Sequence, residues 1–236
     1  MYFAIEGVIG VGKTTLALNI GANVARAGLS VGIYSLEMST PELMERLIMA
    51  EAGVNSSRIQ RHELDADDVF RIGTAICKMS DWNLSIDETP GLSVYELATR
   101  AKKEKSERGM DLLIVDYLQL ITPPKAESRV QEVSVITRSL KILAKEMDIP
   151  ILALSQLSRQ VEQRENAEPR LADLRDSGSI EQDSDQVIFL WWMEKPDPVN
   201  YLTHTQCAVS KNRHGSMGDF PLALLKEQSK FIPRQY

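Results

Sequence analysis

The residues with the clearest chemistry form a glycine-rich run close to the N-terminus. The stretch GVIGVGKT (7–14) satisfies the pattern G-x-x-x-x-G-K-[ST]. In this pattern main-chain N–H groups turn towards phosphates, the lysine reaches the β- and γ-phosphates, and the final hydroxyl holds Mg²⁺. The apolar segment YFAI (2–5) precedes the run and a helical pattern follows it, as the motif requires. The predicted nucleotide-binding residues are Gly7, Gly10, Gly12, Lys13, Thr14 and Thr15.

Three more polar residues stand where apolar, strand-like segments end. Asp116 ends LLIVD, Glu37 ends YSLE, and Gln156 ends LALSQ. Ligands of open α/β sheets bind at the carboxyl ends of the strands. Asp116 is therefore predicted to complete the Mg²⁺ site with Thr14. Glu37 is either a general base for an attacking water or a residue that only leads the next helix. Gln156 is either a sensor of the γ-phosphate or a solvated amide.

Apolar periodicities place these residues on alternating strands and helices. Leu16, Ile20 and Val24 mark the predicted inward face of the first helix. The segments 39–42 and 93–96 both read S-x-x-E, the capping box that begins a helix. The predicted strands are 2–5, 31–37, 83–89, 111–121, 150–155 and 186–192, followed by two more. The predicted helices are 14–27, one that begins after residue 39, 65–80, 93–109 and 130–147. This order implies one α/β domain, with a mostly parallel sheet wrapped on both faces.

Composition limits the classes of function. The chain has 236 residues, 43% hydrophobic and 25% charged, which is typical of a soluble domain with a sizeable core. A net charge of −6 argues against a protein that coats nucleic acid with its whole surface, but leaves contact through a few loops open. The apolar run VIFLWWM (187–193) is too short to cross a bilayer, and no leader pattern precedes the first strand. We therefore expect a cytoplasmic protein that does not bind membranes.

The remaining reactive side chains suggest no further chemistry. Cys77 and Cys207 lack metal-binding spacing and are expected to be buried and reduced. The polar segment 158–183 is interpreted as a long loop, a length that is uncommon unless the loop binds something or is disordered. The histidines without metal-like spacing are His62, His204 and His214.

Several longer stretches occur in a characteristic order. They are YSLEM, LLIVDYLQLI, RSLKILAKEMDIPILALSQLSRQVEQR, DLRDSGSIEQDSDQVIFL and SKNRHG. Together they resemble the C-terminal motor domain of DnaB-type replicative helicases, over about residues 13–236. The resemblance implies a RecA-like fold, ATP and Mg²⁺ as cofactors, and a homohexameric ring around single-stranded DNA. The motor would hydrolyse ATP between subunits, translocate on the strand and unwind duplex DNA.

The resemblance also implies roles for single residues within one subunit. Lys13 and Thr14 match the phosphate and Mg²⁺ residues, and Asp116 matches the second acid of the metal site. Glu37 matches the catalytic carboxylate, and Gln156 matches the γ-phosphate sensor.

Two basic residues are implied to act on the neighbouring subunit. Lys211 and Arg213, in SKNRHG, match the pair that reaches into the adjacent nucleotide site. Arg213 would be an arginine finger, a group that typically contributes roughly 10³ to 10⁵ in rate. Position alone would have indicated only surface charges on a turn.

Two segments are implied to face DNA in the central channel. Arg175, Asp176 and Gly178, in DLRDSGSIE, align with residues that contact the DNA backbone. Lys125 and Arg129 are candidate phosphate contacts in the other channel loop, residues 122–130. Six copies around a pore would concentrate a few cations on one strand, which reconciles DNA binding with an acidic chain.

The sequence departs from the family in two ways. Met1 lies directly before the first strand, so we expect the N-terminal domain and linker helix of full-length members to be absent. A weaker hexamer would follow, with a primase or a helicase loader as further candidate partners. The second departure is the opening EGVIGVGKTT (6–15), which resembles that of deoxynucleoside kinases instead.

Three other functions were weighed against the motor. A deoxynucleoside kinase would need lid arginines, which have no clear counterpart here. A RecA-like ATPase with a loading or regulatory role, including a clock-type ring protein, would share the fold and the ATP site. The channel segments and the wording DYLQL and SQLSR favour the motor over it. A binding module without activity would not need both Glu37 and Arg213.

Overall fold

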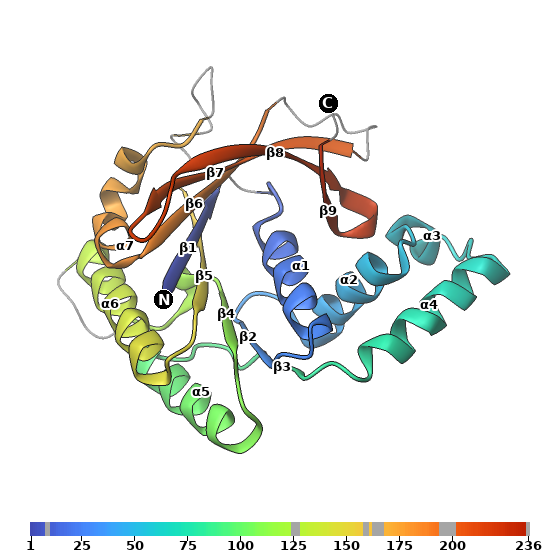
Figure 1. Cartoon of the computed structure of the whole chain (residues 1–236), viewed down its shortest axis with the longest axis horizontal. Helices are drawn as coiled ribbons and strands as arrows, with labels where there is room; N and C mark the ends of the chain where they lie inside the picture. Colours follow the sequence, from blue (N-terminus) through green and yellow to red (C-terminus); the bar gives the residue numbers. More distant parts are fainter. Residues whose placement is uncertain (8–9, 124–127, 158–160, 162–167, 194–201, 235–236) are drawn as a thin grey trace.

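The computed structural model describes the chain from Met1 to Arg234, apart from residues 8–9, 124–127, 158–160, 162–167 and 194–201 (Figure 1). For residues 175–178 it describes the main chain only. No helix in these ranges is long and apolar enough to cross a membrane.

A single twisted sheet runs through the described residues. Its nine strands lie in the order β3-β2-β4-β5-β1-β6-β7-β8-β9. Neighbours from β3 to β6 pair in parallel, and those from β6 to β9 pair antiparallel. The strands are β1 (Tyr2–Gly7), β2 (Val31–Ser35), β3 (Leu84–Asp87), β4 (Leu112–Asp116), β5 (Ile151–Gln156), β6 (Gln186–Trp192), β7 (Leu202–Asn212), β8 (Gly218–Leu225) and β9 (Lys230–Pro233).

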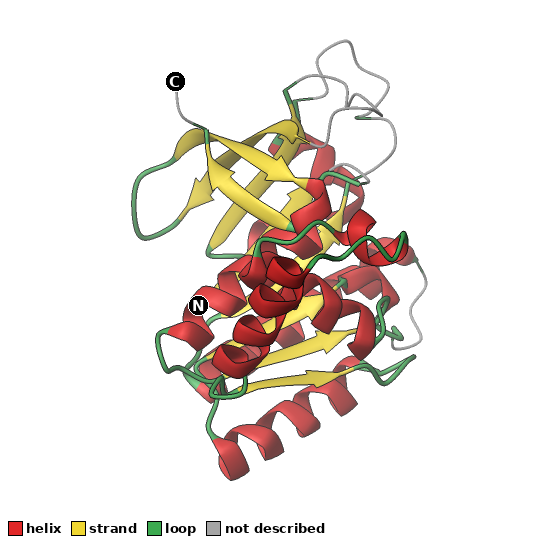
Figure 2. Cartoon of the chain, turned by 90° about the vertical axis from the view of Figure 1, so that its right-hand side faces the viewer, coloured by secondary structure: helices red, strands yellow, loops and turns green. Residues whose placement is uncertain are grey.

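Helices cover both faces of the parallel part of the sheet. In Figure 1, α5 and α6 lie on one side of the strands and α1 and α2 on the other. Figure 2 shows the same layers from the side, with the antiparallel strands above them. The α-helices are α1 (Lys13–Arg26), α2 (Thr40–Ala52), α3 (Ser56–Gln60), α4 (Ala66–Met79), α5 (Val94–Arg108), α6 (Arg129–Met147) and α7 (Gly178–Asp183). The 3-10 helices are η1 (Leu118–Leu120), η2 (Leu171–Ser177) and η3 (Lys226–Gln228).

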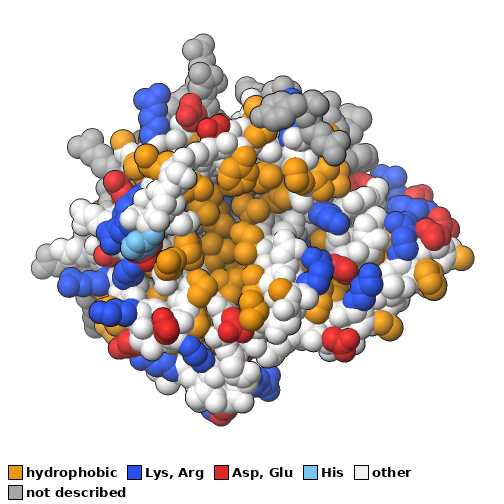
Figure 3. Space-filling model, in the orientation of Figure 1, with side chains coloured by type: hydrophobic (Ala, Val, Ile, Leu, Met, Phe, Trp, Pro, Cys, Tyr) orange, Lys and Arg blue, Asp and Glu red, His pale blue; other side chains and the backbone are white. Residues whose placement is uncertain are grey.

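Each face of the sheet has its own apolar core. Side chains of β1, β4 and β5 alternate between a cluster under α5 and α6 and a second cluster under α1 and α2. Tyr2 and Ala4 belong to the first cluster and Ile5 to the second, as the period of two along a strand requires. A third cluster joins β6 and β7 to the glycine-rich loop. Figure 3 shows apolar side chains gathered in a hollow at the centre of the face that carries α1.

The helix starts agree with the sequence patterns. The Ser39 N–H donates to Glu42 Oε2 at 2.9 Å, at the start of α2. At the start of α5, Ser93 N–H donates to Glu96 Oε2 at 2.9 Å, and Glu96 N–H donates back to Ser93 Oγ at 3.2 Å. Both predicted capping boxes are therefore confirmed.

Several predicted boundaries were wrong. The strand predicted over 31–37 ends at Ser35, and the one over 111–121 ends at Asp116 and continues as η1. Two strands were expected after β6, but three follow it. The polar segment 158–183 contains η2 and α7, which are short and have little apolar periodicity for a sequence pattern to detect.

Two burial expectations were also wrong. The fully buried face of α1 is formed by small residues and Leu18, whereas Leu16, Ile20 and Val24 are only partly buried. Small side chains let α1 approach the sheet closely, which apolar periodicity alone does not indicate. Cys207 is buried as expected, but Cys77 is exposed on α4.

Candidate nucleotide site

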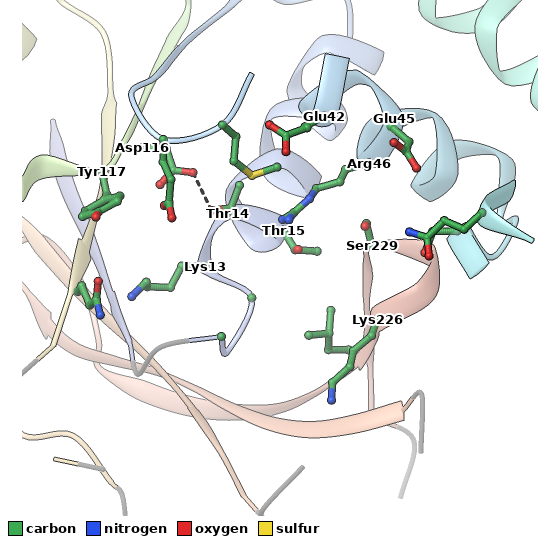
Figure 4. Close-up of a pocket in the computed structure, with 18 residues that line it drawn as sticks. Lys13, Thr14, Thr15, Glu42, Glu45, Arg46, Asp116, Tyr117, Lys226 and Ser229 are labelled. Atoms are coloured by element: carbon green, nitrogen blue, oxygen red, sulfur yellow. Dashed lines mark hydrogen bonds between the residues drawn. The ribbon is translucent and has the colours of Figure 1, made fainter. Parts of the chain in front are cut away.

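A cavity of about 810 Å³ opens at the carboxyl ends of β1, β2, β4 and β5 (Figure 4). Residues from both ends of the chain line it. The start of α1, the β2–α2 segment and the end of β4 form one side, and β8 with η3 forms another. The predicted residues that line the cavity are Gly10, Gly12, Lys13, Thr14, Thr15, Glu37, Asp116 and Gln156.

Two glycines of the loop are required by close approach. Gly12 has φ +93°, and a Cβ there would lie 3.0 Å from Leu224 Cδ2 and 3.1 Å from Phe231 Cζ. A Cβ on Gly7 would lie 2.7 Å from the Leu190 carbonyl oxygen, a backbone atom that cannot move aside easily. The loop therefore packs against β6, β8 and β9 in a way that only glycine allows.

The lysine of the motif folds back over its own loop. Lys13 Nζ donates to the Gly7 carbonyl oxygen at 2.8 Å, and Lys13 is the first residue of α1. Gly7 does not line the cavity, so its part in the loop is to shape it from below. An ammonium group beside the N-terminus of a helix creates a positive region suited to phosphates.

The hydroxyl and the carboxylate predicted for Mg²⁺ are in direct contact. Thr14 Oγ1 donates to Asp116 Oδ2 at 2.7 Å. Burial raises the pKa of the Asp116 carboxyl, and the nearby Glu37 adds to the rise, whereas Thr14, Lys13 and Arg46 oppose it. A hydroxyl oxygen and a carboxylate are hard oxygen ligands, so the two residues fit Mg²⁺ with water and phosphate oxygens in the remaining positions.

Main-chain contacts fix the other two polar residues at this edge. The Leu36 N–H donates to the Asp116 carbonyl oxygen at 2.7 Å, which holds the segment bearing Glu37 beside the end of β4. Gln156 ends β5 in register with Gly7 of β1. The fold therefore brings Glu37, Asp116 and Gln156 together with the loop.

Sequence reasoning missed several residues that line the same cavity. In Figure 4, Arg46 extends from α2 towards Thr15, and Lys226 and Ser229 approach from η3. The position of Arg46, on the helix that follows Glu37, could have indicated it. Lys226 and Ser229 gave no such signal, because only tertiary packing brings them close.

One asparagine holds the C-terminal strand against the first helix. Asn19 Nδ2 donates to the Ser229 carbonyl oxygen at 3.0 Å, and the Phe231 N–H donates to Asn19 Oδ1 at 2.8 Å. This pair of bonds places η3 and the start of β9 at the edge of the cavity.

Lys211 and Arg213 lie elsewhere. Neither lines the cavity, and both donate to main-chain carbonyls around the end of α7. Lys211 Nζ donates to Glu181 O, and to Ser184 O at 2.9 Å. Arg213 donates to Gln182 O. Burial lowers the pKa of the Lys211 ammonium, and the neighbouring Arg213 adds to that effect.

The candidate DNA residues are only partly described. Arg175 and Asp176 belong to η2 and Gly178 begins α7, with side chains outside the described part of the structure. Lys125 also lies outside the described residues. Arg129 begins α6 and is about half exposed, with Nη1 2.9 Å from Glu132 Oε2 and Nη2 2.9 Å from the Gln119 carbonyl oxygen.

A phosphate loop on β1, an acid at the end of β4 and a mostly parallel sheet define a RecA-like ATPase domain. A model of the DnaB-like helicase C terminal domain matches residues 2–233. The chain belongs to this family. The match includes residues 2–12, so the kinase-like opening lies within the family domain, whereas the sequence resemblance had been placed from about residue 13.

Individual relatives agree with this assignment. The chain is 40% identical over 229 residues to the replicative DNA helicase DnaB of Geobacillus stearothermophilus and to the replicative DNA helicase DnaC of Bacillus subtilis (strain 168). Each alignment covers 94% of this chain and 50% of the relative, so the chain spans about half the length of these relatives.

Solved structures show the same fold. One of them, an isolated ATPase domain, superimposes with a TM-score of 0.90 at 34% identity, covering 99% of this chain and 84% of that one. A DnaB-like replicative helicase, described with its interactions with primase, gives the same score and identity over 99% of this chain and 59% of that one.

Proposed function

We propose that this domain hydrolyses Mg²⁺-bound ATP between the subunits of a ring and uses the energy to translocate on single-stranded DNA and unwind duplex DNA. The observation that carries the proposal is the division of the predicted residues. Lys13, Thr14 and Asp116 surround one cavity, while Lys211 and Arg213 lie outside it. A site that lacks its transition-state cations within one subunit is consistent with sharing between subunits.

Within the cavity each residue has a proposed role. Lys13 holds the β- and γ-phosphates, and Thr14 and Asp116 hold Mg²⁺. The ion, when bound, neutralises phosphate charge and orients the nucleotide. Glu37 accepts a proton from the attacking water, and Gln156 contacts the γ-phosphate at the end of β5.

Between subunits, Arg213 is proposed to stabilise the charge that develops on the transferred phosphoryl group. Lys211 acts beside it. Both side chains now bond to carbonyls of their own subunit, so assembly has to exchange these bonds for contacts with the neighbouring nucleotide.

The partners proposed for the domain follow from the family. Single-stranded DNA is the track, contacted by Arg175, Asp176 and Gly178 on one side and by Lys125 and Arg129 on the other. A homohexamer is the proposed working unit, with a primase or a helicase loader as a further partner. A motor that acts on replicating DNA would work in the cytoplasm.

The first experiment is steady-state ATP hydrolysis with Mg²⁺ at several protein concentrations, with and without single-stranded DNA. Turnover per subunit that rises with both concentration and DNA is expected, because sites are completed by assembly and DNA engages the channel. Turnover that responds to concentration but not to DNA would favour a RecA-like ATPase with a loading or regulatory role. Turnover that responds to neither, with phosphate transferred to a deoxynucleoside, would overturn the motor.

A further inference from the structure

Glu6 is a buried carboxyl that the proposed function leaves unused. It lies on β1 directly before the glycine-rich loop, is 0% exposed, and neither carboxylate oxygen has a hydrogen-bond partner among the described residues. An ionised carboxylate in such a place is very costly, and a neutral carboxylic acid is far less so. Burial raises the pKa of Glu6 to about 8, and the Ser155 hydroxyl and the Lys13 ammonium only partly oppose this rise.

The groups that face Glu6 come from three strands and one helix. In register with Glu6 are Ser155 of β5 and Phe189 of β6. Tyr2 lies on the same face of β1, and its own pKa is raised by burial and then by Glu6. Lys13 of α1 is the cation whose charge lowers the pKa of Glu6, by less than burial raises it.

A second buried polar group shares the Ser155 hydroxyl. Gln119 Nε2, from η1, donates to Ser155 Oγ at 2.9 Å and to the Gln156 carbonyl oxygen at 3.3 Å. Its Oε1 is buried without a hydrogen-bond partner among the described residues. Gln119 thus lacks a donor, and the carboxylic acid of Glu6, next to the same serine, is a donor that lacks an acceptor.

Gln119 also contacts a candidate DNA residue through its main chain. Arg129 Nη2 donates to the Gln119 carbonyl oxygen at 2.9 Å. Hydrogen bonds therefore lead from Arg129, at the start of α6, through Gln119 to Gln156 at the edge of the nucleotide cavity. Each member belongs to a different element, so a movement of one is transmitted to the next.

We propose that Gln119 is a positioning residue that joins Arg129 to Gln156, and that Glu6, as a neutral acid, holds the Gln119 amide in the orientation this requires. The role of this connection in coupling DNA to hydrolysis rests on the proposed function. The protonation state of Glu6 does not, and it is tested separately.

The first test compares the stability of Glu6→Gln with that of the parent from pH 4.5 to 9, by urea unfolding. Because its folded pKa is raised, Glu6 contributes stability that is complete below about pH 4.5, the value for an unfolded chain, and is lost as pH rises through about 8. The unfolding constant of the parent should therefore rise, relative to Glu6→Gln, by about tenfold per pH unit across this range. All other groups are the same in both proteins and cancel. A ratio that does not change with pH would overturn the neutral acid.

The second test measures how strongly DNA stimulates ATP hydrolysis at pH 7. Gln119→Leu should lower the stimulation by about tenfold, the effect of losing one or two hydrogen bonds, while the Kd for ATP stays within about threefold. Gln131→Leu, an exposed change on α6, is the matched control and should behave like the parent. Glu6→Leu should resemble Gln119→Leu, whereas Glu6→Gln, which keeps a donor, should not.

Two outcomes separate this inference from the proposed function. If the parent is stimulated by DNA and Gln119→Leu is stimulated equally, the connection is wrong and the motor stands. If the parent is not stimulated at all, the motor is wrong, and the pH dependence of the Glu6→Gln comparison still decides the state of Glu6. A stimulation of the parent that falls above pH 8, and that of Glu6→Gln that does not, would support both parts together.

Discussion

At the scale of residues, two carboxylates at neighbouring strand ends are given different tasks by their surroundings. Asp116 is buried and accepts a hydrogen bond from Thr14, so it suits a fixed metal site. Glu37 lies on the segment after β2 and lines the open cavity. A carboxylate that water can reach is better placed for proton transfer.

Glu37→Gln should slow ATP hydrolysis by roughly 10² to 10⁴, the usual contribution of general base catalysis. The amide has the same shape but cannot accept the proton, so ATP affinity should stay within about threefold. Turnover with saturating Mg²⁺–ATP and the Kd of a fluorescent ATP analogue would measure the two effects. Glu107→Gln, an exposed change at the end of α5, serves as the control. Turnover that equals the parent's would remove Glu37 from the mechanism.

The two cysteines should differ in reactivity. Cys77 is exposed on α4, whereas Cys207 is buried and its pKa is raised by burial to about 11. Because the thiolate is the reactive form, a chromogenic disulfide reagent should label one thiol rapidly in the native protein and the second only on unfolding. Cys77→Ser should abolish the rapid phase. Rapid labelling that survives in Cys77→Ser would mean that β7 opens readily.

Residues that act through a local pattern could be predicted from the sequence. Lys13 and Thr14 belong to one short motif, and Asp116 ends an apolar run that can only be an inner strand. Lys226 and Ser229 could not be found in this way, because they reach the cavity through the packing of β9 against α1. The exposure of Cys77 was missed because α4 packs through only a narrow buried face, formed by Asp68, Ala75 and Met79.

At the scale of elements, α5 depends on its first turn. Ser93 and Glu96 satisfy each other's N–H groups, and the rest of the helix is highly charged. Ser93→Ala should lower the free energy of unfolding by about 1 kcal/mol, because it leaves an N–H of the first turn without an acceptor.

Urea unfolding followed by circular dichroism would measure this change. Ser106→Ala is the matched control, since Ser106 is exposed in the last turns of the same helix and bonds only to the Lys103 carbonyl oxygen. It should change the free energy of unfolding by less than about 0.5 kcal/mol. Equal losses in both variants would show that the cap contributes nothing particular to α5.

The elements also show where sequence patterns lose their value. The long helices α1, α4, α5 and α6 were predicted to within about one residue at each end, because several turns of periodicity and clear caps define them. β4 was predicted too long, because the apolar residues of η1 continue its run, with Leu118 turned into the core. α7 was missed because six residues carry too little pattern.

At the scale of the whole molecule, the separation of Arg213 from the cavity has a testable consequence. Arg213→Ala and Lys13→Ala should each be nearly inactive alone, because one lacks the shared cation and the other lacks the phosphate contact. Mixed, they should recover hydrolysis, since about one interface in four pairs an intact loop with an intact Arg213 in a randomly assembled ring.

Turnover of the mixture against the sum of the separate proteins would measure the recovery. A control mixture of Arg213→Ala with a variant that carries both changes should show none, because no intact Arg213 is present. Recovery absent from the first mixture, under conditions where the parent assembles, would show that Arg213 does not act across an interface.

The packing of Gly12 against Leu224 and Phe231 also sets an order of events during protein synthesis. A ribosome adds Gly12 more than two hundred residues before Phe231. At roughly 5 to 20 residues per second, the glycine-rich loop waits roughly 10 to 40 s for the strands that support it. ATP therefore cannot guide the early folding of the emerging chain, and the capacity to bind it arises only when the last hairpin has left the exit tunnel.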